Sequence, residues 1–116
     1  MKRLWQATLN SWHGLLAVAQ SEQAFREELV VLVIGAPLAF WLTADAGKRM
    51  ALIGTLLVLL IVELLNTAIE KLSDRVSRDR DPVLKRVKDM GSAAILLSLL
   101  LAGAVWLWVV AERFWP

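Results

Sequence analysis

The sequence places one carboxylate, Glu63, inside a stretch that is otherwise apolar. Asn66, Glu70 and Asp74 follow it three, seven and eleven residues later. At about 100° per residue, these four positions fall within roughly an 80° arc of a helix. One helix face would therefore carry proton acceptors and the oxygen ligands that Mg²⁺ prefers. A charge inside an apolar span is costly and indicates function, although the same face could be a polar seam that joins helices through Asn66.

Lys88, Asp89 and Ser92 form a second polar group, at the start of a later apolar run. Ser92 lies four residues after Lys88 and three after Asp89, so a helix would place it between them. Lys88 could contact a phosphate as a point charge. A lone Lys at a membrane surface, however, often only extends its charge toward water.

A third polar group consists of Glu22, Arg26, Glu27 and Glu28, just before the first apolar run. Glu22 and Arg26 are four residues apart and could simply form a surface ion pair. The same carboxylates could instead take part in catalysis. The residues alone leave both interpretations open.

The composition of the chain excludes several other kinds of site and partner. The 116 residues include no Cys, which excludes disulfides and thiolate metal sites, and His13 is the only His. Thirteen basic and eleven acidic side chains give a net charge of +2, too even to argue for nucleic acid as a partner. Hydrophobic residues make up 58%, above the roughly 45–50% usual in soluble domains, and there are six Trp. We therefore expect a small, all-α, integral membrane protein with one domain, residues 1–116.

Three apolar runs predict three membrane-spanning helices, at residues 29–44, 50–69 and 93–111. The first is short and contains Pro37, but a tilted or shielded helix of that length can still cross a bilayer. The alternative is a soluble three-helix bundle. Its helices would need polar faces, which the second and third runs almost lack.

The remaining segments are polar or amphipathic. Residues 1–28 have helical spacing of apolar side chains, with Trp5 and Trp12 as anchors, and predict an amphipathic region at the membrane surface. Residues 70–92 predict a loop rich in Lys and Arg. The positive-inside rule then puts the N-terminus and this loop in the cytoplasm and the C-terminus in the periplasm.

These motifs together resemble the prokaryotic diacylglycerol kinase family. The resemblance rests on E-L-L-N-T-A-I-E at 63–70, S-D-R at 73–75 and K-D-M-G-S-A-A at 88–94, with E-Q-A-F-R-E-E at 22–28. The combination is specific, and segment lengths fit over nearly the whole chain. The sister branch, undecaprenol kinase, is similar too, but Met-Gly-Ser after Lys88-Asp89 looks more like the diacylglycerol branch.

The resemblance implies a homotrimer in the bacterial inner membrane, with active sites shared between subunits. It implies transfer of the γ-phosphoryl group of ATP to diacylglycerol, which gives phosphatidic acid. Glu63 would be the general base, and Glu22 and Glu70 would hold the Mg²⁺ that accompanies ATP.

The resemblance also implies two sets of binding residues. The nucleotide-binding positions are Arg3, Asn10, Glu22, Asn66, Glu70, Asp79, Arg80, Asp81, Lys88 and Asp89. The lipid-binding positions are Arg3, Ala24, Phe25, Arg26, Glu27, Glu28, Trp41, Arg49, Glu63, Ser92 and Trp106. Asn10 stands where the family often has an aromatic residue, and residues 79–82 are atypical for the family.

Two alternatives come from other classes of protein. In a small cation transporter or channel subunit, the acidic face would line an ion path. A structural anchor for a partner protein would tolerate Glu63→Gln. Neither explains Glu22 together with Lys88 and Asp89.

Overall fold

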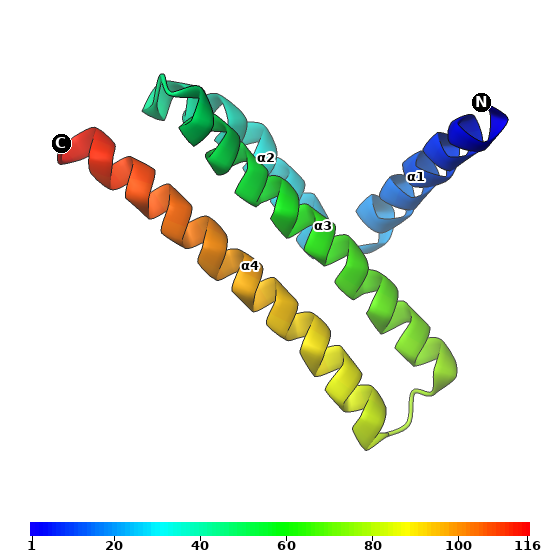
Figure 1. Ribbon diagram of the computed structural model, residues 1–116. Coiled ribbons are helices and arrows are strands. Elements are labelled where there is room, and N and C mark those ends of the chain that lie inside the picture. The colour runs from blue at the N-terminus through cyan, green and yellow to red at the C-terminus, as the bar shows by residue number, and fades with distance from the viewer.

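The chain forms four helices and no strand, as described by a computed structural model of residues 1–116. The helices are α1 (Lys2–Ser21), α2 (Gln23–Leu42), α3 (Ala46–Val76) and α4 (Pro82–Phe114). The predicted all-α class is confirmed. Helices α2, α3 and α4 run alongside one another with alternating direction, and α1 projects away at an angle (Figure 1). Helix α3 lies at the centre and packs against both α2 and α4.

Local chemistry explains where α3 and α4 begin. The Asp45 carboxylate accepts a hydrogen bond from the backbone N–H of Lys48 at 2.8 Å, which caps α3. Asp81 accepts from the N–H of Val83 at 2.8 Å and so caps α4. Pro82 occupies the first turn, where its missing N–H costs nothing.

The connection between α3 and α4 is much shorter than the predicted loop. Residues 70–92 are mostly helical, because α3 continues to Val76 and α4 begins at Pro82, which leaves only residues 77–81 between them. The prediction of a loop over 70–92 was wrong in extent. Hydropathy marks where apolar side chains stop, whereas a helix continues into water until a cap or a breaker ends it.

Two helices, α3 and α4, are long and apolar enough to cross a membrane. Helix α2 is not among the helices that meet this requirement of length and apolar composition. Its first turns carry the charged residues Arg26, Glu27 and Glu28. The three-span arrangement therefore stays a prediction. Helix α1 has no buried residue, and its place at the membrane surface stays a prediction as well.

The tightest packing lies toward the α2–α3 turn. Ala39 and Leu42 of α2 meet Leu52 of α3 and Val109 of α4 in one buried cluster. The Trp106 indole N–H of α4 donates to the Leu52 carbonyl at 3.2 Å and ties α4 to α3 there. This cluster fixes the three helices at the end away from Glu63 and Glu70.

Candidate active site

Glu63 lies on the face of α3 that turns into the bundle. Its side chain is only 7% exposed, and Asn66, one turn further on, is buried as well. The Asn66 Nδ2 atom donates to Oε1 of Glu70 at 3.0 Å. The helical spacing in the sequence therefore does bring Glu63, Asn66 and Glu70 to one side of one helix.

A second carboxyl group meets Glu63 from α2. Glu28 lies within hydrogen-bonding reach of Glu63, and its Oε2 atom is buried without a partner. Burial, and next the neighbouring Glu63 carboxylate, raise the pKa of Glu28 to about 7. Glu22 and Glu70 are also close enough for their charges to act on Glu63. Four carboxyl groups thus gather where the start of α2 packs on α3.

Glu22, which joins this group of carboxylates, is itself the single extended residue between α1 and α2. Lys71 of α3 forms an ion pair with it, 3.7 Å from Nζ to Oε1. Glu22 and Glu70 offer the anionic oxygens that suit Mg²⁺, and the Asn66 Oδ1 atom nearby is buried without a partner. The donor chemistry therefore fits the ion, although no three Asp, Glu or His side chains are already arranged as a metal cluster.

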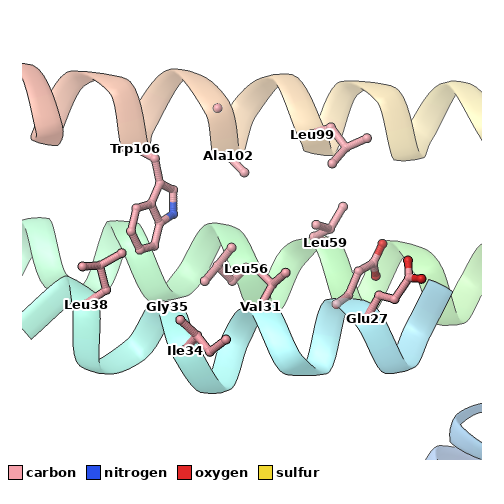
Figure 2. Close-up of a pocket in the computed structure, with 12 residues that line it drawn as sticks. Glu27, Val31, Ile34, Gly35, Leu38, Leu56, Leu59, Leu99, Ala102 and Trp106 are labelled. Carbon is pink, nitrogen blue, oxygen red and sulfur yellow. The ribbon is translucent and has the colours of Figure 1, made fainter. Parts of the chain in front are cut away.

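An apolar groove of about 610 Å³ runs between α2, α3 and α4. Its wall is formed largely by aliphatic side chains and one indole, among them Val31, Ile34, Leu38, Leu56, Leu59, Leu99 and Trp106. In Figure 2, Trp106 points across the groove from α4, and the Glu27 carboxylate stands toward the other end. Glu27, Glu28 and Trp106, three of the predicted lipid-binding residues, line this groove.

Gly35 sets how closely α2 approaches α3 along this groove. A Cβ atom at position 35 would lie 2.6 Å from Cδ1 of Leu56, which is nearer than real carbon atoms come. A glycine here lets the two backbones come together. No local sequence pattern indicated this contact.

A second, polar pocket of about 460 Å³ lies at the α3–α4 turn. Four predicted nucleotide-binding residues line it, namely Asp79, Arg80, Asp81 and Lys88. Lys85 lines it too and was missed, although it stands one turn before Lys88 in the same basic segment.

Two ion pairs frame the polar pocket. The Lys88 Nζ atom bonds Oδ1 of Asp74 at 2.5 Å and so joins α4 to α3, and Lys85 bonds Asp89 at 2.8 Å. The hydrogen bond from Lys88 lowers the pKa of Asp74 below its usual value. Lys85 and Lys88 both line the pocket, so a bound phosphate could replace Asp89 or Asp74 as the partner of either ammonium group.

Some predicted lipid-binding residues lie at the opposite end of the bundle. Arg49 donates from Nε to the Thr43 carbonyl at 2.7 Å and from its guanidinium to the Phe40 carbonyl at 3.1 Å, so it closes the last turn of α2. Trp41 packs against Phe114 there, with 6.2 Å between ring centroids. Within one chain, the structure does not bring these residues near Glu63.

Others lie outside the groove on or near α1. Arg26 donates to the carbonyls of Ala19 and Gln20 at the end of α1, at 2.6 and 3.2 Å. Asn10 accepts a hydrogen bond from Gln6, and both residues are exposed. The remaining predicted positions outside the groove are Arg3, Ala24 and Ser92, all exposed, and Phe25, which is buried.

Comparison with known proteins decides the family. The model of the prokaryotic diacylglycerol kinase family matches residues 9–110. The chain belongs to this family. It is 40% identical over 112 residues to a diacylglycerol kinase of Escherichia coli strain K12, covering 97% of this chain and 92% of that protein. It is 44% identical over 106 residues to a diacylglycerol kinase of Pseudomonas aeruginosa, covering 91% and 86%.

Family membership confirms the resemblance seen in the sequence. A diacylglycerol kinase of Haemophilus influenzae is 34% identical over 106 residues, again over 91% of this chain. These three relatives share one printed name, which belongs to the diacylglycerol branch rather than to undecaprenol kinase. The matched residues include the four carboxyl groups of Glu22, Glu28, Glu63 and Glu70 and both ion pairs of the polar pocket.

Proposed function

We propose that the chain is a diacylglycerol kinase, which transfers the γ-phosphoryl group of ATP to the lipid hydroxyl and gives phosphatidic acid and ADP. Family membership supports the reaction. The structural observation that carries it is a buried carboxylate close to an apolar groove, with the polar pocket at the turn between α3 and α4. A lipid alcohol needs the first, and a nucleotide needs the second.

In this mechanism Glu63 is the general base. Its carboxylate takes the proton of the lipid hydroxyl, while the hydroxyl oxygen forms a bond to the γ-phosphorus and the bond from that phosphorus to the β–γ bridging oxygen breaks. The proton ends on Glu63 and the electron pair of the broken bond leaves with ADP. Burial keeps competing water away from the reacting oxygen.

Glu22 and Glu70 would hold Mg²⁺ with the nucleotide, and Asn66 would orient Glu70 through the hydrogen bond between them. When bound, the ion neutralises the charge of the phosphates during transfer. Lys88 and Asp89 would contact phosphates and sugar, and residues 79–81 the rest of the nucleotide. The groove residues Glu27, Glu28 and Trp106 would line the site of the diacylglycerol.

We also propose a homotrimer in the inner membrane, with shared sites. Large apolar side chains on α2 and α4, such as Val33, Leu97 and Leu107, are exposed in the single chain and need lipid or another subunit beside them. Arg3 on α1 favours shared sites, because α1 projects away from α2, α3 and α4 of its own chain (Figure 1). The N-terminus and the turn at 77–81 would be cytoplasmic.

The reaction is tested with purified protein in detergent, radiolabelled ATP, Mg²⁺ and either diacylglycerol or undecaprenol. We expect labelled phosphatidic acid. Labelled undecaprenyl phosphate formed at a higher rate would assign the chain to the sister activity. Cation flux in vesicles without ATP, together with no lipid product, would favour the transporter.

The absence of Cys makes the topology directly testable. Single-cysteine variants Arg78→Cys and Trp115→Cys are treated with a maleimide that cannot cross membranes. In intact spheroplasts only the second should react, and in inside-out vesicles only the first. Labelling of both from the same side would refute the three-span arrangement, since it would require an even number of crossings between them.

Shared sites are tested by mixing subunits of two inactive variants, Glu63→Gln and Arg3→Ala. Recovery of activity on mixing is expected if one subunit supplies α1 to the Glu63 of another. No recovery, with mixed trimers shown by mass, would place each whole site within one chain.

A further inference from the structure

The contact between Glu28 and Glu63 brings two carboxyl groups together from different helices. The Oε2 atom of Glu28 is fully buried and has no hydrogen-bond partner, while Glu63 has no such buried, unpartnered oxygen. An ionised Glu28 would thus keep a charged oxygen without water or a donor, which is costly.

No cation offsets these charges. None of the ion pairs in the structure involves Glu28 or Glu63, and Lys71 pairs with Glu22 instead. The other charged groups that act on the two are Glu27 beside Glu28, and Glu22 and Glu70 beside Glu63, all of them acidic. Helix α4 adds only uncharged residues to the groove at this point. Two carboxyl groups in contact without a cation favour the state in which one of them holds a proton.

We propose that Glu28 keeps a proton and donates it in a hydrogen bond to the ionised Glu63, so that Glu28 positions the catalytic base. This inference rests on the proposed role of Glu63. The hydrogen bond fixes the orientation of the Glu63 carboxylate and leaves its other oxygen for the lipid hydroxyl. It also stabilises the ionised form of Glu63, the form that can accept a proton.

Two substitutions of Glu28 distinguish its role as a hydrogen-bond donor from the effect of its ionisation. Glu28→Gln keeps an N–H donor of similar size but cannot ionise, whereas Glu28→Leu removes the donor. Asp45→Asn is the matched control, because it makes the same carboxylate-to-amide change at the far end of α3 and Asn still caps a helix.

The pH profile of kcat is the first measurement. Glu28→Gln should lower kcat less than Glu28→Leu does, and should lose the decline that begins near the Glu28 pKa of about 7. Glu28→Leu should lower kcat about tenfold or more and move the acidic limb to higher pH, since ionised Glu63 loses its donor. Equal losses at every pH would mean that Glu28 only fills space, and would overturn the proposal.

Infrared spectroscopy gives a measurement that does not depend on turnover. The carbonyl band of a protonated carboxylic acid should be present at neutral pH, disappear in Glu28→Gln and remain in Asp45→Asn. A band that disappears only in Glu63→Gln would put the proton on Glu63 and overturn the assignment. If the band behaves as expected but the wild type makes no phosphatidic acid, the proposed function fails while the hydrogen-bonded pair stands.

Discussion

Gly91 of α4 lies directly against Asn66 of α3, so that a Cβ atom at position 91 would overlap Oδ1 of the asparagine. The other end of the same amide, Nδ2, donates to Glu70. Because Gly91 has no side chain, the Asn66 amide has room to lie where it can bond Glu70. A glycine near the start of α4 thus bears on the acidic group of α3.

Gly91→Ala should displace Asn66 and release Glu70. We expect the KM for Mg·ATP to rise and kcat/KM to fall about tenfold or more, because a displacement of about an ångström in a catalytic site is costly. Steady-state kinetics at several Mg²⁺ concentrations measure this. Gly14→Ala is the control, since a Cβ atom there meets nothing within 4 Å; an equal loss in both variants would contradict the role given to Gly91.

Glu63→Gln should lower kcat by roughly two or more orders of magnitude, because the amide cannot take up the hydroxyl proton. Nucleotide affinity and assembly should persist, since the substitution removes a buried charge and leaves size unchanged. Lipid phosphorylation and nucleotide binding are measured on the same preparation. Near-normal turnover would move the base elsewhere, with Asp89 as the next candidate.

Glu22→Gln and Glu70→Gln should each raise the Mg²⁺ concentration needed for half-maximal activity, because each removes an anionic oxygen ligand. Lys71→Gln is the matched control: it breaks the ion pair with Glu22 but keeps the Glu22 carboxylate. If Lys71→Gln reproduces the effect of Glu22→Gln, the carboxylate acts through the ion pair and not through the metal.

The raised pKa of Glu28 predicts a pH-dependent stability. Between the usual value of 4.5 and about 7 the folded protein holds a proton that the unfolded chain has lost, so this group makes folding less favourable as pH rises through that range. Glu28→Gln removes this dependence. The thermal midpoint of the variant relative to the wild type should therefore increase from pH 4.5 to pH 7, as followed by thermal unfolding in detergent.

Lys48 and Glu112 form an ion pair that joins the first turn of α3 to the last turn of α4. Trp108 of α4 also donates to Glu112, at 2.8 Å. The hydrogen bond from Lys48 lowers the pKa of Glu112, so the stabilisation is present above its usual value of 4.5 and is lost as pH falls below it. Glu112→Gln should lower the thermal midpoint at pH 7 and leave kcat unchanged, and the difference in midpoint should shrink in acid.

Sequence patterns predicted the parts of the site that lie along one helix. The spacing of Glu63, Asn66 and Glu70 was sufficient to place them on one face, because a helix repeats regularly. The contact of Glu28 with Glu63 and that of Gly91 with Asn66 join different helices. Their register depends on how side chains pack across the bundle, which no local spacing specifies.

The same distinction holds for the fold. The second and third apolar runs lie within α3 and α4, and the first lies in α2 except for its last two residues, Thr43 and Ala44. The end of α3 and the start of α4 were not predicted, since both lie in the polar segment between the second and third apolar runs, where Asp81 and Pro82 begin α4. Lys85 was missed for a related reason. It lines the polar pocket because the turn at 77–81 is short, whereas we predicted a long loop over 70–92.

Helix α1 has no buried residue, and Arg26 holds only its last carbonyls. In proteins, most of the stability of a helix comes from the packing of its apolar face against other elements. The protein's own core therefore does little to keep α1 helical. If α1 lies at the membrane surface as predicted, we expect Trp5, Trp12 and the basic residues near the N-terminus to supply most of that stability through the interface.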